Sequence, residues 1–165
     1  MADAQQFAPS ESSLSTCARE TSALAQALSA VLSGICRLVF QTHALHRDAG
    51  SAMPPSVKEV TEQHYTSMFS AAGKLAEQLR VMGHLPPSQL EHVIKESRAV
   101  AEEQKSGTGW TVADLAGGHE QLAGSLHTLT ELAANHNDPA TKDWAAARRT
   151  FHGEAAWRLR SLTIL

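Results

Sequence analysis

Apolar residues recur every three or four positions along four stretches of this chain, and polar residues fill the positions between them. This spacing places the apolar side chains on one face of an α-helix. The abundance of Ala, Leu, Gln and Glu also favours helix over strand. The sequence therefore predicts four amphipathic helices. Their expected core positions are Leu24, Leu28, Val31, Ile35, Leu38, Thr42 and Leu45 in the first; Val57, Val60, His64, Met68, Ala71 or Ala72, Leu75, Leu79 and Met82 in the second; Val112, Leu115, His119, Leu122, Leu126, Leu129 and Leu132 in the third; and Trp144, Ala147, Phe151, Ala155, Leu159 and Leu162 in the fourth.

Prolines and capping residues mark where these helices begin. Pro55 is expected in the first turn of the second helix, where its missing N–H costs nothing. Thr111, followed three residues later by Asp114, predicts a capping box at the start of the third helix. Asp138 is the predicted N-cap of the fourth helix and Pro139 its first residue. The first helix is expected from about residue 13.

The segment between the second and third helices is long and contains a predicted short helix of its own. Ser88 is the expected N-cap of this short helix, and Leu90, Val93 and Ile94 are its apolar positions. A long crossover is typical of ferritin-like four-helix bundles. The sequence therefore predicts an all-α, ferritin-like bundle over residues 13–165, with a crossover helix, preceded by a flexible N-terminal arm over residues 1–12.

Length and charge fit one globular domain and disfavour nucleic-acid binding. The chain has 165 residues and a formal net charge of −3, and its first six residues contain no lysine or arginine. That segment also lacks the basic and apolar regions of a secretory signal, so we expect a cytoplasmic protein. Cys17 and Cys36 would lie about 28 Å apart on one helix, too far for a disulfide.

The most apolar stretch, residues 23–40, is long enough to be considered as a membrane span. Gln26, Ser29, Ser33 and Arg37 recur along it at helical spacing. This pattern predicts one solvated face, as in a core helix of a bundle, and no membrane association.

The second helix carries an unusual polar stripe. Lys58, Glu62, Gly73 and Glu77 are separated by four, eleven and four residues. At about 100° per residue, all four fall near one edge of the helix. The stripe is therefore a candidate binding surface.

The first helix ends with His43 and His46, which lie three residues apart and so share a face. Imidazole and carboxylate groups on facing helices form the non-haem iron and manganese sites of helical bundles. The alternative is a solvated i, i+4 salt bridge between Lys58 and Glu62, worth a few tenths of a kcal/mol. Both interpretations stay open at this point.

Three further histidines, His64, His119 and His152, occur within the helices that build the core, and they are interpreted as hydrogen-bonded core histidines rather than ligands. No nucleophilic triad or phosphate-binding loop is predicted, because the Gly107–Gly109 segment and the Gly117, Gly118 pair lack the strand and helix context of those motifs. The candidate chemistry is therefore metal binding.

Three segments resemble the Dps family, the small dodecameric ferritins of starved bacterial cells. They are EQHY and AEQLRVMG in residues 62–83, DLAGGHEQL in residues 114–122 and HGEAAWRLR in residues 152–160. The resemblance covers most of the chain from about residue 20 onward. It implies Fe(II) oxidation, usually with hydrogen peroxide, at sites shared across a two-fold dimer interface. It also implies iron storage in a homododecamer and a role in peroxide stress.

The resemblance places the family's metal ligands on five positions of this chain. One histidine falls on His46, and a histidine, two aspartates and a glutamate fall on Lys58, Glu62, Gly73 and Glu77. Lys58 and Gly73 cannot bind iron as those ligands do, so an impaired site is expected. DNA compaction, the family's other activity, often depends on basic tails, which this chain lacks, so we expect little DNA binding.

Two hypotheses follow for the altered site. In the first, His46, Glu62 and Glu77 still bind iron, with His43 or His64 as an additional ligand, although His64 lies off the Glu62 edge. In the second, the lysine ammonium neutralises the two carboxylates in place of a metal. The protein would then be a non-catalytic shell or interaction protein.

Overall fold

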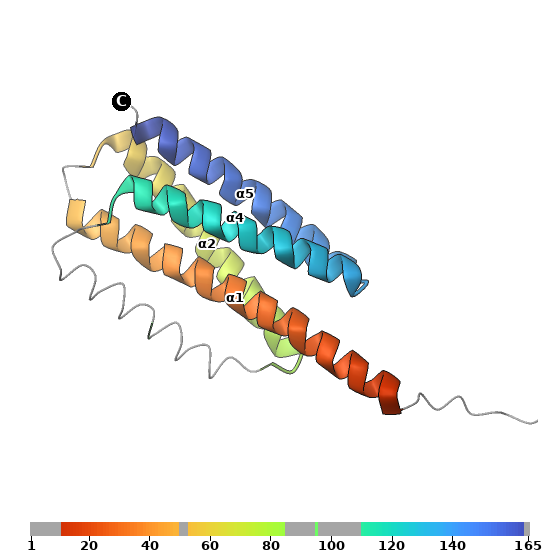
Figure 1. The fold of residues 1–165 in the computed structure, drawn as a ribbon. Coiled ribbons are helices and arrows are strands. Elements are labelled where there is room, and N and C mark those ends of the chain that lie inside the picture. The colour runs from red at the N-terminus through yellow and green to blue at the C-terminus, as the bar shows by residue number, and fades with distance from the viewer. Residues whose placement is uncertain (1–10, 50–52, 85–94, 96–109, 164–165) are drawn as a thin grey trace, which may run out of the picture.

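The computed structural model describes residues 11–49, 53–84, 95 and 110–163. These residues form four long helices and, among themselves, no strand. The helices are α1 (Glu11–Ala49), α2 (Pro55–Val81), α4 (Val112–Asn135) and α5 (Pro139–Thr163). Figure 1 shows them lying side by side in one bundle, which confirms the predicted all-α fold class.

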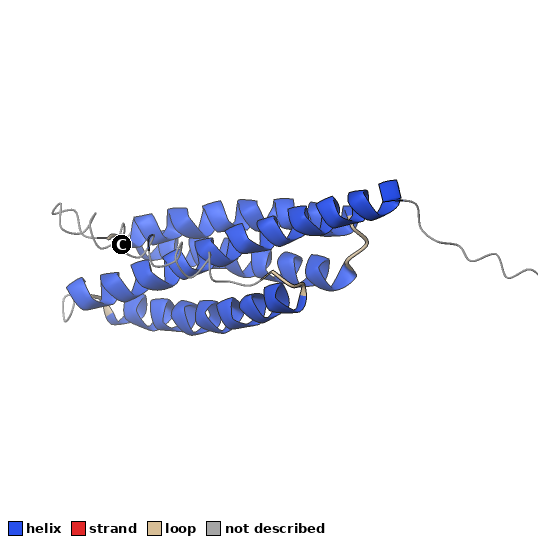
Figure 2. Cartoon of the chain, turned by 90° about the horizontal axis from the view of Figure 1, so that it is seen from below, coloured by secondary structure: helices blue, strands red, loops and turns tan. Residues whose placement is uncertain are grey.

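Each helix packs against two neighbours: the contacting pairs are α1 with α2, α1 with α4, α4 with α5, and α2 with α5. Neighbouring helices run antiparallel and stay aligned along their length (Figures 1 and 2). Because α2 ends at the opposite end of the bundle from the start of α4, the connection between them has to span the bundle (Figure 1). This is the predicted crossover.

Two predictions concern segments that are wholly or partly outside the described residues. The short helix with Ser88 as its N-cap falls in residues 85–94, and the N-terminal arm falls largely in residues 1–10. The first long helix begins at Glu11, two residues before its predicted start.

The predicted helix starts are present in the structure. The backbone N–H of Asp114 donates to Thr111 Oγ1 at 3.1 Å, and the N–H of Thr111 donates to Asp114 Oδ2 at 2.9 Å, which completes a capping box. At the start of α5, Thr141 N–H donates to Asp138 Oδ1 at 3.0 Å and Pro139 is the first helical residue. These caps satisfy amides that a helix end otherwise leaves without partners.

The ends of α2 and α4 use the left-handed backbone conformation. Gly83 has φ of 76° and Asn137 has φ of 53°. The N–H of His84 donates to the carbonyl oxygen of Leu79 at 3.0 Å, the contact of a Schellman motif. Glycine and asparagine tolerate this conformation best, so Gly83 closes α2 and Asn137 follows the end of α4.

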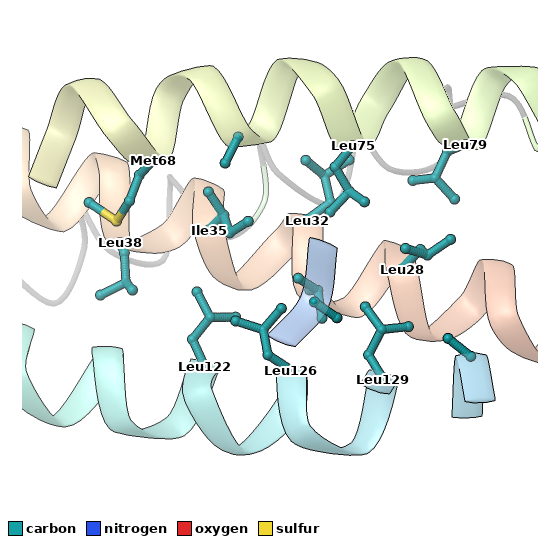
Figure 3. Packing of buried hydrophobic residues seen from close by; sticks show 14 of the residues in the cluster. Leu28, Leu32, Ile35, Leu38, Met68, Leu75, Leu79, Leu122, Leu126 and Leu129 are labelled. Atoms are coloured by element: carbon teal, nitrogen blue, oxygen red, sulfur yellow. The ribbon is translucent and has the colours of Figure 1, made fainter. Parts of the chain in front are cut away.

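Leucines from three helices meet in the core. The predicted stripes of α1, α2 and α4 face one another there, and a fully buried leucine contributes about 1.5–3 kcal/mol. Figure 3 shows Leu28, Leu32, Ile35 and Leu38 of α1 beside Met68, Leu75 and Leu79 of α2 and Leu122, Leu126 and Leu129 of α4.

The predicted core face of α5 was wrong in part. Ala147 is exposed, whereas Thr141, Ala145 and His152 are fully buried. The buried face of α5 runs through Thr141, Ala145 and His152, at spacings of four and seven residues, and so does not include Ala147. Thr141 is accommodated because its hydroxyl accepts a hydrogen bond from Gln78 Nε2 of α2 at 2.6 Å.

The segment Ala23–Arg47 of α1 is long and apolar enough to cross a membrane by length and composition, and 50% of its most apolar window is buried inside the protein. Gln26 and Arg37 on this helix are exposed. An apolar face buried against α2 and α4, with a polar face outside, is typical of a core helix in a bundle.

Candidate functional site

A pocket lies between the C-terminal part of α1 and the N-terminal part of α2. Its volume is about 170 Å³. Its lining residues are Thr42, His43 and His46 from α1, and Glu62, Tyr65 and Thr66 from α2. The structure thus brings together three of the predicted site residues, His43, His46 and Glu62.

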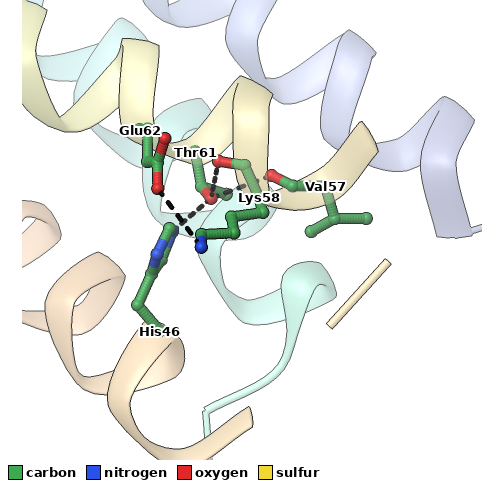
Figure 4. Close-up of polar contacts among 5 residues, drawn as sticks. All are labelled: His46, Val57, Lys58, Thr61 and Glu62. Carbon is green, nitrogen blue, oxygen red and sulfur yellow. Dashed lines mark hydrogen bonds and ion pairs between the residues drawn. The ribbon is translucent and has the colours of Figure 1, made fainter. Parts of the chain in front are cut away.

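His46 is held by a hydrogen bond that sequence reasoning missed. Its Nε2 atom contacts Thr61 Oγ1, as Figure 4 shows. The Thr61 hydroxyl itself donates to the carbonyl oxygen of Val57 at 2.8 Å. A hydroxyl has only one proton, so the first contact is made either by His46 Nε2–H donating to Thr61 Oγ1 or by the Thr61 hydroxyl donating to His46 Nε2 instead of to a carbonyl oxygen. In both cases the nitrogen that faces α2 is already hydrogen-bonded.

Burial keeps His46 neutral. Desolvation lowers the pKa of this histidine, the Glu62 carboxylate opposes that effect, and Lys58 adds to it. A metal at Nε2 would have to displace Thr61. In the sequence, the only signal for the contact between His46 and Thr61 is that Thr61 lies next to Glu62. The contact itself depends on how α1 packs on α2.

Lys58 places a positive charge next to Glu62, one of the residues that line the pocket. Its Nζ atom lies 3.9 Å from Glu62 Oε1, and both side chains point toward His46 (Figure 4). The Lys58 and Glu62 side chains are 57% and 58% exposed. At this exposure the ion pair is worth at most about 1 kcal/mol of stability. Its importance lies in the charge that it supplies beside Glu62.

Gly73 and Glu77 lie too far from the pocket to complete it within one chain. Glu77 is fifteen residues beyond Glu62 on the same helix, which corresponds to about 22 Å along the axis. Both residues are exposed, and no atom lies within 4 Å of the position that a Cβ would take at Gly73. Among the described residues, no three His, Cys, Asp or Glu side chains converge as a metal site does.

His64 belongs to a second, buried group of histidines rather than to the pocket. His64 of α2, His119 of α4 and His152 of α5 are all buried. The ring centroids of His64 and His119 are 5.3 Å apart, and His119 Nδ1 lies 2.8 Å from His152 Nδ1. We call these three residues the histidine cluster. All three lie in the core, as the sequence predicted.

Arg148 fixes the direction of the hydrogen bonds in the histidine cluster. Its Nη2 atom lies 3.4 Å from His152 Nε2, and a guanidinium group can only donate. His152 Nε2 therefore accepts, so its Nδ1–H donates to His119 Nδ1. Arg148 also donates to Ser67 Oγ at 3.0 Å and lies over the Phe151 ring at 4.1 Å. No carboxylate among the described residues forms an ion pair with it.

Burial makes the histidine cluster neutral at physiological pH. Desolvation lowers the pKa of His64 to about 4, that of His119 to about 3 and that of His152 to about 2. The positive charge of Arg148 lowers the last two further. Within the described part of the chain, His64 Nδ1 is buried without a hydrogen-bond partner. A cation next to Arg148 would be repelled, so this cluster is unsuited to hold a metal ion.

Comparison with known proteins links the bundle to one family. A family model described as a ferritin-like domain matches residues 25–163. An uncharacterized low temperature-induced protein of Nostoc sp. is 28% identical over 127 residues, which cover 75% of this chain and 70% of the relative. Its homolog in Anabaena variabilis matches to the same extent.

Proposed function

Because this chain belongs to the ferritin-like domain family, we propose that it is a Dps-like protein that binds and sequesters iron. In this proposal the chain assembles into a homododecamer built from dimers and oxidises Fe(II) only weakly. Its cellular role would be protection against peroxide stress. The relatives that are named for induction at low temperature fit a stress role.

The pocket between α1 and α2 carries this proposal. It places an imidazole, His46, and a carboxylate, Glu62, next to each other at an exposed edge of a ferritin-like bundle. Nitrogen and oxygen donors of this kind suit Fe(II). His43 lines the same pocket and is available as an additional ligand.

The third proposed ligand has to come from another subunit. Glu77 lies about 22 Å from Glu62 along α2, so one chain cannot use both at one metal ion. In a two-fold dimer, Glu77 of the partner subunit would face the pocket. The exposure of Lys58, Glu62, Gly73 and Glu77 on one edge of α2 supports such a shared site.

Three features weaken the proposed site. Lys58 supplies a positive charge where a ligand is needed, and Gly73 supplies no donor atom. The hydrogen bond between His46 Nε2 and Thr61 must also break before that nitrogen can coordinate iron. Each feature disfavours Fe(II) binding, so the proposed oxidation is slow rather than efficient.

A second candidate function is a non-catalytic shell or interaction protein. The 3.9 Å contact between Lys58 Nζ and Glu62 Oε1 favours it, because an ammonium group can balance a carboxylate as a metal ion does. In this alternative the assembly persists but neither binds nor oxidises Fe(II). Iron titration distinguishes the two.

The first test is an anaerobic Fe(II) titration of the wild-type protein, followed by addition of hydrogen peroxide. The proposed function predicts saturable Fe(II) binding and slow formation of Fe(III), followed by its absorbance. Absence of saturable binding, with oxidation no faster than in buffer, would establish the non-catalytic alternative.

The second test restores the missing ligands. The double variant Lys58→His, Gly73→Asp should oxidise Fe(II) at least about tenfold faster than the wild type, because both positions regain donor atoms. The open space at Gly73 accommodates the new side chain. A matched control is Lys142→His, Gly124→Asp, which makes the same changes at exposed positions of α5 and α4. Equal rates in the two double variants would contradict the assignment of the site.

A further inference from the structure

The outer edge of α2 carries an aromatic pair in which Phe69 is exposed and Tyr65 is half-buried. Tyr65 and Phe69 stack with ring centroids 6.2 Å apart and an angle of 14° between their planes. Phe69 is 65% exposed, and the His43 ring of α1 lies 6.5 Å from that of Tyr65. Aromatic residues gathered at an exposed edge are typical of protein interfaces.

Lys58 and Glu62 on one side of this aromatic pair, and Gly73 and Glu77 on the other, are placed symmetrically along α2. Along α2, the midpoint between Lys58 and Glu77 falls between residues 67 and 68. The midpoint between Glu62 and Gly73 falls at the same place. The aromatic pair lies within one helical turn of that point. Two copies of this edge of α2 can therefore face each other in an antiparallel arrangement with corresponding positions opposite one another.

If a two-fold axis crosses α2 between residues 67 and 68, the symmetric positions of two subunits lie opposite each other. A second copy then runs antiparallel, with Glu77 of the partner subunit opposite Lys58. Gly73 of the partner subunit lies opposite Glu62. The aromatic pairs of the two copies meet in the middle and bury apolar surface. An interface of this kind uses the same patch on both subunits and closes as a dimer.

We propose that Lys58 forms an ion pair with Glu77 of the partner subunit, and that this pair holds the two-fold interface together without a metal ion. The inference rests on the proposed function, which needs two subunits at the site. The inference adds the identity of the groups that connect the two subunits. Opposite charges meet at both ends of the interface, and like charges would meet there if either residue were reversed.

The ion pair also explains how iron binding can be weak rather than absent. Each end of the interface then holds one ammonium, from Lys58, and two carboxylates, from Glu62 and from Glu77 of the partner subunit. The charges of these three groups sum to one negative charge at each end. Fe(II) is attracted to that charge, but it must compete with Lys58 for the carboxylate of the partner.

The test is a charge-reversal cycle on the full chain in the presence of EDTA. Dimer dissociation constants are measured by analytical ultracentrifugation at low and high salt. Lys58→Glu and Glu77→Lys should each weaken the dimer at least about tenfold, and the double variant should return to within about threefold of the wild type. The wild-type dimer should weaken with added salt, because the pair lies at the exposed ends of the interface.

The control is Lys142→Glu, which reverses one exposed charge on α5, away from this edge. Circular dichroism checks that every variant keeps its helices. Single variants that dissociate like the control, or a double variant no tighter than the singles, overturn the ion pair and leave the proposed assembly standing. A wild-type chain that stays monomeric at all concentrations overturns the assembly, and the ion pair with it.

Discussion

At the residue scale, the surroundings of each histidine decide what it can do. His46 is hydrogen-bonded to Thr61 through Nε2, and His43 lines the pocket beside it. His64 sits in the core with a buried nitrogen that has no hydrogen-bond partner among the described residues. The same residue type is therefore a candidate iron ligand at the α1–α2 edge and a source of acid sensitivity in the core.

The histidine cluster predicts loss of stability in acid. Each of its pKa values is lowered in the folded state, so the unfolded chain binds more protons below about pH 6.5. Stability is therefore full above that pH and falls as the pH decreases toward 4. At pH 5 each histidine contributes a loss of about 2 kcal/mol. Urea unfolding at pH 7 and pH 5 measures this loss.

Replacing His64 separates this effect from general acid sensitivity. The variant His64→Leu removes a buried nitrogen that has no partner, so its stability at pH 7 should stay within about 1 kcal/mol of the wild type. Between pH 7 and pH 5 it should lose about 2 kcal/mol less than the wild type. His127→Leu, at an exposed position of α4, should leave the pH dependence unchanged. Parallel pH profiles for the wild type and His64→Leu would contradict the assignment.

At the element scale, α1 and α4 approach closely through two reciprocal contacts. A Cβ at Gly34 of α1 would lie 2.9 Å from Leu122 Cδ1 of α4. A Cβ at Gly118 of α4 would lie 2.6 Å from Leu38 Cδ2 of α1. Each glycine thus makes room for a core leucine of the other helix. This spacing supports the α1 surface on which the pocket is built.

The close approach predicts that a larger side chain destabilises the protein more at Gly118 than at Gly117. Gly118→Val should destabilise the protein by about 1–3 kcal/mol, because the new side chain overlaps Leu38 in a packed core. Gly117→Val is the matched control, since no atom lies within 4 Å of a Cβ at that position. Thermal unfolding of the two variants checks the difference. Equal melting temperatures would show that α1 and α4 separate easily.

At the scale of the whole molecule, the charge of the chain disfavours DNA compaction and leaves the proposed iron sequestration unaffected. The formal net charge is −3, and the first ten residues contain no lysine or arginine. A protein with a negative net charge and no cationic side chain in its first ten residues is expected to displace few counterions from DNA. Its binding to DNA should therefore be weak and sensitive to salt. The proposed shell would therefore hold iron without compacting a chromosome.

A gel shift with duplex DNA at low and moderate salt tests this expectation. The wild-type chain should form no stable complex at about 150 mM salt. A variant with Gln5→Lys and Gln6→Lys adds two cations to the first ten residues and should bind more tightly at low salt than the wild type. A wild-type complex that survives moderate salt would show that the fold itself presents a DNA-binding surface.

The sequence by itself determined the helices, their caps and most of the core. Periodic leucines, Pro55, the Thr111–Asp114 capping box and Gly83 act through contacts within a few residues, so they can be recognised without the fold. The same local logic placed Lys58, Glu62, Gly73 and Glu77 on one edge of α2. It was wrong at Ala147, because the buried face of α5 runs through Thr141, Ala145 and His152 and leaves Ala147 on the exposed side.

Only the tertiary structure decided which of these residues meet. Packing of α1 on α2 joined His46 to Thr61 and to the Lys58–Glu62 pair, and packing of α2, α4 and α5 gathered His64 with His119 and His152. These contacts join residues on different helices, and helical periodicity contains no information about which faces pack together.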